Sequence, residues 1–114
     1  MKLIVYHLKT CDTCRKAIKA LNKAGHELTL IDVRADGIPA QKLSEITSSV
    51  GSDILLNTRS TTWRGLSDAQ KSDVTAEKAV ALMQEHPTLM KRPVIDTGSD
   101  FYVGWKAEVQ SQLI

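Results

Sequence analysis

Cys11 and Cys14 are the only cysteines among the 114 residues, and two residues separate them. They open a stretch with helical spacing of apolar residues, so Cys11 is expected at a helix start. Unpaired backbone N–H groups and the positive end of the helix dipole stabilise an anion at such a position, and Lys9, Arg15 and Lys16 add positive charge nearby. The pattern predicts that Cys11 is a nucleophilic thiolate and that Cys14 resolves its mixed disulfides.

Two other interpretations of the cysteine pair remain open. Cys14 also falls on the apolar face of the predicted helix, where a cysteine can be simply a small core residue. The pair could also be half of a zinc site, but such a site needs about four ligands. Only His7 is close by in the sequence, while His26 and His86 belong to other predicted elements, so no bound metal is expected.

The elements around the cysteines predict a βαβ unit. Residues 2–7 read as a buried strand, the helix opened by the cysteine motif stops at Gly25, and residues 28–33 read as a second strand. Two strands joined through a helix in this way are parallel, with a right-handed connection. The cysteine motif is therefore expected directly after the first strand.

Helices and a hairpin are predicted for the rest of the chain. One helix is expected from Pro39 to Gly51, and Ser67 opens a short helix with a capping box. Thr75 caps a longer helix that ends before Pro87. Two short strands, 93–96 and 101–103, flank a glycine-containing loop and predict an antiparallel hairpin, followed by a last helix from about Trp105 to Leu113.

This order predicts an α/β, thioredoxin-like fold with a helical insertion. We expect one domain over residues 1–114, with residues 1–35 and 75–114 as the core and about 36–74 as the insertion. The net charge of +2 does not favour direct binding of nucleic acid. No apolar run is long enough for a signal peptide or a membrane span, so a cytoplasmic protein without a membrane partner is expected.

Arg59 and Arg92 are candidates for binding an anion near Cys11. If the bond before Pro93 is cis, its loop would pack against the cysteine motif and present its backbone to a substrate. Guanidinium groups near a thiolate can hold an oxyanion or a glutathione carboxylate by paired hydrogen bonds. From spacing alone, two arginines 33 positions apart are more often ordinary surface residues.

Three segments together carry a family resemblance: 10–17 (TCDTCRKA), 56–64 (LNTRSTTWR) and 86–94 (HPTLMKRPV). In this order, along essentially the whole chain, they resemble the glutaredoxin-linked arsenate reductase family, whose superfamily includes the YffB-type proteins and the Spx-type regulators. The resemblance implies a nucleophile at Cys11, a cis Pro93, and an oxyanion or glutathione site that we assign to Thr10, Arg59, Arg92 and Pro93.

The chain departs from true arsenate reductases at two places. Trp105 follows Gly104 where the family has a third oxyanion arginine, and Cys14 is a second cysteine where those enzymes have one. The segment TTWR at 61–64 is similar to the YffB-type proteins, whereas the cysteine pair is similar to the Spx-type regulators, whose extended C-terminal segment does not follow Ile114.

The resemblance implies an arsenate reductase-family thiol–disulfide oxidoreductase that binds no cofactor and uses glutathione as thiol co-substrate. Its expected partners are glutathione or glutaredoxin and a small oxyanion or disulfide substrate. The alternative is a redox-sensing transcriptional regulator that binds the RNA polymerase α subunit. A third interpretation, a member of the same fold with purely structural cysteines, predicts unreactive thiols.

Overall fold

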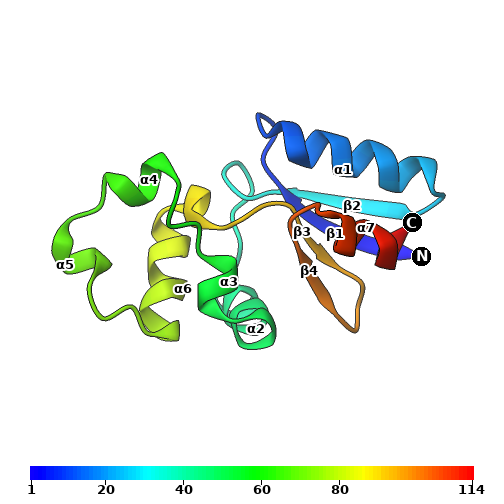
Figure 1. The fold of residues 1–114 in the computed structure, drawn as a ribbon. Coiled ribbons are helices and arrows are strands. Elements are labelled where there is room, and N and C mark those ends of the chain that lie inside the picture. Colours follow the sequence, from blue (N-terminus) through cyan, green and yellow to red (C-terminus); the bar gives the residue numbers. More distant parts are fainter. The chain divides into compact units, whose positions relative to one another are not determined.

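Four strands form one mixed sheet in the order β2-β1-β3-β4. The computed structural model describes residues 1–114, and this sheet belongs to the first of two compact units, Met1–Asp36 with Arg92–Ile114 (Figure 1). The strands are β1 (Lys2–His7), β2 (Glu27–Asp32), β3 (Val94–Asp96) and β4 (Phe101–Val103). β1 and β2 are parallel, and β3 runs antiparallel to both β1 and β4. The predicted βαβ unit and hairpin are therefore confirmed, with the second strand starting and ending one residue earlier than expected.

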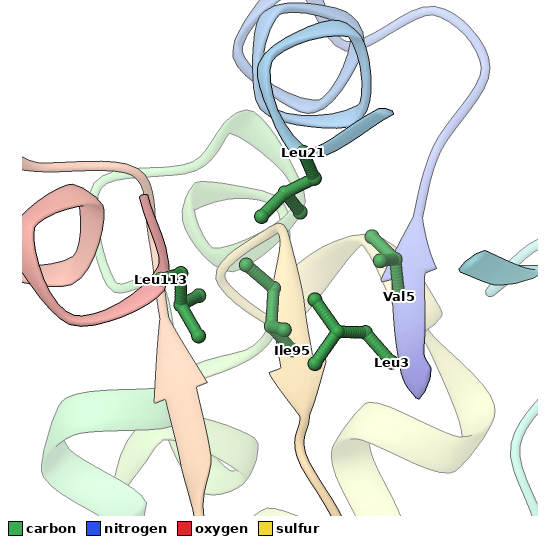
Figure 2. Packing of buried hydrophobic residues seen from close by; sticks show 5 residues of the cluster. All are labelled: Leu3, Val5, Leu21, Ile95 and Leu113. Atoms are coloured by element: carbon green, nitrogen blue, oxygen red, sulfur yellow. The ribbon is translucent and has the colours of Figure 1, made fainter. Parts of the chain in front are cut away.

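Helices α1 (Asp12–Lys23) and α7 (Ala107–Leu113) pack on the same face of this sheet. Figure 2 shows how β1 and β3 meet these helices in one buried cluster, made of Leu3, Val5, Leu21, Ile95 and Leu113. The alternation of β1 turns Leu3 and Val5 to the same side, and the helical spacing of α1 brings Cys14, Ala17 and Leu21 onto its buried stripe. The buried cluster of the first unit thus packs against the C-terminal half of α1 through Leu21, and the buried stripe of the helix continues from there to Cys14 in its first turn.

Helix α7 begins later than the sequence predicted. Trp105 lies before the helix, packs against the buried cluster, and accepts a hydrogen bond from the Gln110 side chain at its carbonyl oxygen (2.9 Å). Gly104 precedes it at φ +85°, in the left-handed region that favours glycine. The turn at Gly104 and the packing of Trp105 therefore delay the helix to Ala107.

The second unit is the continuous segment Gly37–Lys91 and is helical. Its α-helices are α2 (Ala40–Val50), α3 (Ser52–Leu55), α4 (Thr61–Arg64), α5 (Asp68–Lys71) and α6 (Ala76–Glu85), followed by the 3-10 helix η1 (Pro87–Leu89). The capping box at Ser67 and the cap at Thr75 are confirmed, whereas α3, α4 and η1 were not predicted. Pro39 precedes the first turn of α2 and does not belong to it.

The division between the units differs from the boundary expected from the sequence. We expected residues 75–114 with the core, but α6 belongs to the second unit, where it packs against α2. Buried side chains on both helices explain this arrangement, namely Leu43 and Ile46 on α2 and Ala79, Leu82 and Met83 on α6. No helix in the structure is long and apolar enough to cross a membrane.

Candidate active site

Cys11 is the N-cap residue of α1, as its position before the helical stripe predicted. Its backbone is extended (φ −89°, ψ 114°), its N–H donates to the Leu8 carbonyl (3.0 Å), and its carbonyl accepts the first helical hydrogen bond from Arg15 (3.1 Å). The side chain is half-buried, and its sulfur makes no capping hydrogen bond of normal geometry. The sulfur is therefore placed where the first-turn N–H groups point, while remaining open to a reactant.

Opposing effects act on the pKa of the Cys11 thiol. Burial raises the pKa, but the backbone N–H of Cys14, the Cys14 thiol and the guanidinium of Arg92 outweigh burial and lower the pKa below its ordinary value. The N–H and the cation both stabilise the thiolate over the thiol. Cys11 thus has the electrostatic surroundings of a nucleophile.

Cys14 lies one turn along the helix with no exposed surface. Burial and the neighbouring Cys11 raise the pKa of its thiol to about 12, against the backbone N–H of Leu8, which lowers the pKa. Both cysteines are free thiols in the structure. The pKa values of the two thiols therefore differ in the direction that a nucleophile and a resolving thiol require. Cys14 also fills a core position, as its place on the apolar face of the helix predicted.

Arg92 is the cation whose charge acts on Cys11 from outside the motif. It immediately precedes β3, and the Arg92–Pro93 peptide bond is cis, as expected. Pro93 is buried, and its carbonyl accepts a hydrogen bond from Gly104 N–H (2.8 Å) in the segment after β4. Arg15, which was expected to help the thiolate, instead pairs with Asp12 and donates to the Lys9 carbonyl (3.1 Å).

Asp32 is a functional candidate that the sequence analysis missed. It ends β2, is 5% exposed, and accepts hydrogen bonds from three backbone N–H groups: Arg34 and Ala35 (2.9 Å each) and Lys9 (3.2 Å). These N–H groups, that of Ala35 first, lower the pKa of the Asp32 carboxyl, so it stays charged. Because Lys9 lies two residues before Cys11, Asp32 positions the loop that carries the nucleophile.

The remaining predicted residues are not all brought together. Thr10 is exposed, directly before Cys11, in the first unit. Arg59 belongs to the second unit, where it is exposed, its N–H donates to Asn57 Oδ1 (3.1 Å), and its carbonyl accepts from Arg64 (3.0 Å). The first unit therefore joins Thr10, Cys11, Cys14, Arg92 and Pro93, and the role of Arg59 stays a prediction.

A comparison with known protein families tests whether the chain is related to the arsenate reductases, as its motifs implied. The model of the ArsC family matches residues 6–113. The chain belongs to the ArsC family. It is an arsenate reductase-like protein with the thioredoxin-like α/β fold of that family. An uncharacterised protein of Haemophilus influenzae is 41% identical over 93 residues, which cover 82% of this chain and 82% of that protein.

Solved structures of ArsC-like proteins match nearly the whole chain. A YffB protein is 33% identical with a TM-score of 0.92, covering 97% of each chain. An arsenate reductase (ArsC) related protein from Brucella melitensis is also 33% identical, with a TM-score of 0.77, covering 98% of this chain and 93% of the other. An arsenate reductase from Vibrio cholerae, 19% identical with a TM-score of 0.86 over 100% and 98% of the chains, shares the fold.

Proposed function

We propose that this protein is a glutathione-dependent thiol–disulfide oxidoreductase in which Cys11 is the nucleophile and Cys14 the resolving thiol. One observation carries the proposal: the pKa of Cys11 is lowered and that of Cys14 is raised, within one turn of the same helix. The Arg92 guanidinium contributes to the lowered pKa of Cys11. Such a pair keeps one sulfur reactive and the other protonated until it is needed.

The reaction follows from these two sulfurs. The Cys11 thiolate attacks one sulfur of a disulfide RS–SR, the bond Cys11–S–SR forms, and RS⁻ leaves. Cys14 Sγ then attacks Cys11, its proton passes to the departing sulfur, and the products are the Cys11–Cys14 disulfide and RSH. Cys11 is neutral once it is in the mixed disulfide, so it no longer raises the pKa of Cys14 by its charge. Two molecules of glutathione reduce the new disulfide by the same exchange: the first forms a mixed disulfide with one cysteine and frees the other, and the second releases glutathione disulfide.

Trp105, which stands where arsenate reductases have an arginine, favours a disulfide over arsenate as the substrate. This residue occupies the position of the third oxyanion arginine, and it packs against the hydrophobic cluster of the first unit. An indole offers one N–H donor and no positive charge. In the first unit, Arg92 is then the guanidinium group proposed for an anionic part of the substrate, and the role of Arg59 stays a prediction from the family resemblance.

The decisive experiment is the pH dependence of alkylation by iodoacetamide, with the modified residue identified by peptide mass spectrometry. The rate at Cys11 should rise with a midpoint clearly below the free-cysteine pKa of about 8.5. Cys14, with a pKa of about 12, should stay unmodified at pH 8.5, where only about 0.03% of it is thiolate. A Cys11 midpoint at or above that of free cysteine contradicts the proposal.

The role of each cysteine is tested with oxidised glutathione. Cys11→Ser should abolish formation of any adduct, whereas Cys14→Ser should accumulate a glutathione adduct on Cys11. The wild type should form the internal disulfide, seen as a mass lower by two hydrogens. Equal behaviour of the two serine variants contradicts the assignment of roles.

The same pair of thiols supports a second function, that of a redox-sensing regulator. Cys11 is half-buried at the start of α1, and Cys14 is buried one turn further on. A disulfide between them would change the first turn of α1 on the side where Cys11 is partly exposed. A switch of this kind requires a partner that binds the dithiol and disulfide forms with different affinity. A pull-down with the RNA polymerase α subunit under reducing and oxidising conditions tests it, and absence of binding in both excludes this function.

A further inference from the structure

A cavity of about 260 Å³ lies in the first unit beside the loop that carries Cys11. It is lined by Leu8, Lys9, Thr10, Asp32, Arg34 and Ala35. Thr10 is the residue immediately before Cys11. A water molecule in the liquid takes up about 30 Å³, so the cavity has room for a group of several heavy atoms next to the nucleophile.

The walls of this cavity are fixed by one buried carboxylate. Asp32 accepts the N–H of Lys9 in the β1–α1 loop (3.2 Å) and the N–H groups of Arg34 and Ala35 in the turn after β2 (2.9 Å each). It is 5% exposed. The cavity is therefore built from two segments of backbone tied together through a single side chain.

Two cations, Lys9 and Arg34, line the cavity without a salt-bridge partner, beside the charged Asp32 carboxylate, which is bound by backbone N–H groups. The side chains of Lys9 and Arg34 are exposed. The carboxylate of Asp32 is occupied by backbone N–H groups, and that of Asp36 accepts the Asp32 N–H (2.9 Å). Two unpaired cations on a preformed cavity favour an anionic group of the ligand.

We propose that this cavity is a subsite for a carboxylate carried by the thiol or disulfide substrate, with Lys9 and Arg34 as the residues that select it. The inference rests on the proposed function, since it takes Cys11 as the group that meets the substrate sulfur. A small peptide thiol carries carboxylates a few bonds from its sulfur, so its sulfur can reach Cys11 while a carboxylate enters the cavity. Arg34 offers the paired N–H groups that match a carboxylate.

The test compares two disulfides that differ in charge. Rates of mixed-disulfide formation at Cys11 are measured with glutathione disulfide and with neutral bis(2-hydroxyethyl) disulfide, in the wild type, Arg34→Gln and a matched control, Lys23→Gln. Lys23 is an exposed cation in the last turn of the same unit's α1. The ratio of the two rates should fall about two- to fivefold in Arg34→Gln, the size expected for loss of one exposed ion pair, and stay at the wild-type value in Lys23→Gln.

Reversing the charge sharpens the test. Arg34→Glu should lower the ratio further than Arg34→Gln, and high salt should reduce the wild-type preference for glutathione disulfide. An unchanged ratio in both Arg34 variants, with Cys11 still reacting with both disulfides, overturns the subsite and leaves the proposed function standing. Failure of Cys11 to react with either disulfide in the wild type overturns both.

Discussion

Each unit contains contacts between residues far apart in the chain, but only in the first unit do such contacts fix the loop that carries Cys11. In the first unit, β1 pairs with β2 and with β3, Asp32 holds the N–H of Lys9, and His26 Nε2 donates to the Leu113 carbonyl (2.5 Å). In the second unit, three of the helices begin with a side chain that accepts an N–H three residues further on. These caps are Ser60, Ser67 and Thr75.

This difference determines which substitutions can change the reactivity of Cys11. The loop that carries Cys11 is tied to residues far along the chain, so a distant substitution in the first unit can change the chemistry of its sulfur. A helix cap in the second unit satisfies a backbone group within its own first turn. Its loss should lower stability and leave Cys11 unaltered.

The largest effect is expected from Leu21→Ala in the first unit. Leu21 has no exposed surface and lies in the cluster with Leu3 and Ile95. Deleting a buried leucine side chain leaves a cavity, and the free energy of unfolding should fall by about 3 kcal/mol. Urea unfolding followed by tryptophan fluorescence, from Trp63 and Trp105 together, measures the loss. Leu30→Ala, the same substitution at a residue 46% exposed on β2, should lose less than about 1 kcal/mol, and equal losses would contradict the cluster as the core.

Asp32→Asn tests the long-range tie to the nucleophile. An amide keeps one acceptor oxygen but offers N–H groups where the second carboxylate oxygen stood, so one backbone N–H loses its charged partner. The free energy of unfolding at pH 7 should fall by about 1–2 kcal/mol, and the midpoint of Cys11 alkylation should move towards that of free cysteine.

The pH dependence of this variant has a definite sign. Backbone N–H groups lower the pKa of Asp32 in the folded state, so its stabilisation is present above the ordinary carboxyl pKa of about 3.9 and is lost as the pH falls through the lowered value. The difference in stability between the wild type and Asp32→Asn should therefore vanish in acid. Asp100→Asn, in the exposed hairpin loop, is the control and should change neither stability nor alkylation.

Ser67→Ala tests the local character of the second unit. Ser67 Oγ accepts the Gln70 N–H (3.2 Å), and Gln70 Oε1 accepts the Ser67 N–H in return (2.9 Å). Loss of the cap should lower the free energy of unfolding by about 1 kcal/mol. The Cys11 alkylation profile should be unchanged, and a shifted midpoint would break the comparison between the units. Ser48→Ala, at an exposed position inside α2, is the control and should not lower the free energy of unfolding.

The smallest effect is expected from Thr62→Val. Thr62 Oγ1 lies 2.7 Å from Thr88 Oγ1, which joins α4 to η1 across 26 residues. Valine keeps the shape and removes the hydroxyl, so the loss should be roughly 0.5–1 kcal/mol. Thr61→Val, at an exposed position of the same helix, should lower the free energy of unfolding by less. If Thr62→Val cost more than Ser67→Ala, the second unit would depend on its longer ties more than on its caps.

Local patterns predicted most of the fold. The strand at residues 2–7, its parallel partner, Cys11 at the helix start and the cap at Thr75 are all signalled by neighbouring residues. Helices α3 and α4 have four residues each, too few to show a period, and only the serine before α4 marked its start.

The electrostatic partners of the site were harder to predict. The role of Asp32 depends on the N–H of Lys9, which lies 23 residues away, and no spacing rule connects the two. A partial signal existed, because an aspartate that ends a strand often accepts the N–H two residues on, as Asp32 does from Arg34. Arg92 was a candidate because it precedes Pro93, and the family resemblance strengthened that prediction, since charge and composition do not pair it with Cys11.

The interrupted chain of the first unit has a consequence for synthesis on the ribosome. β1, α1 and β2 emerge first, but β3 and β4 follow only after residues 37–91 have been translated. At roughly 5–20 residues per second, the nascent chain waits several seconds with one edge of β1 unpaired. The continuous second unit is thus fully translated before the sheet bearing Cys11 can close.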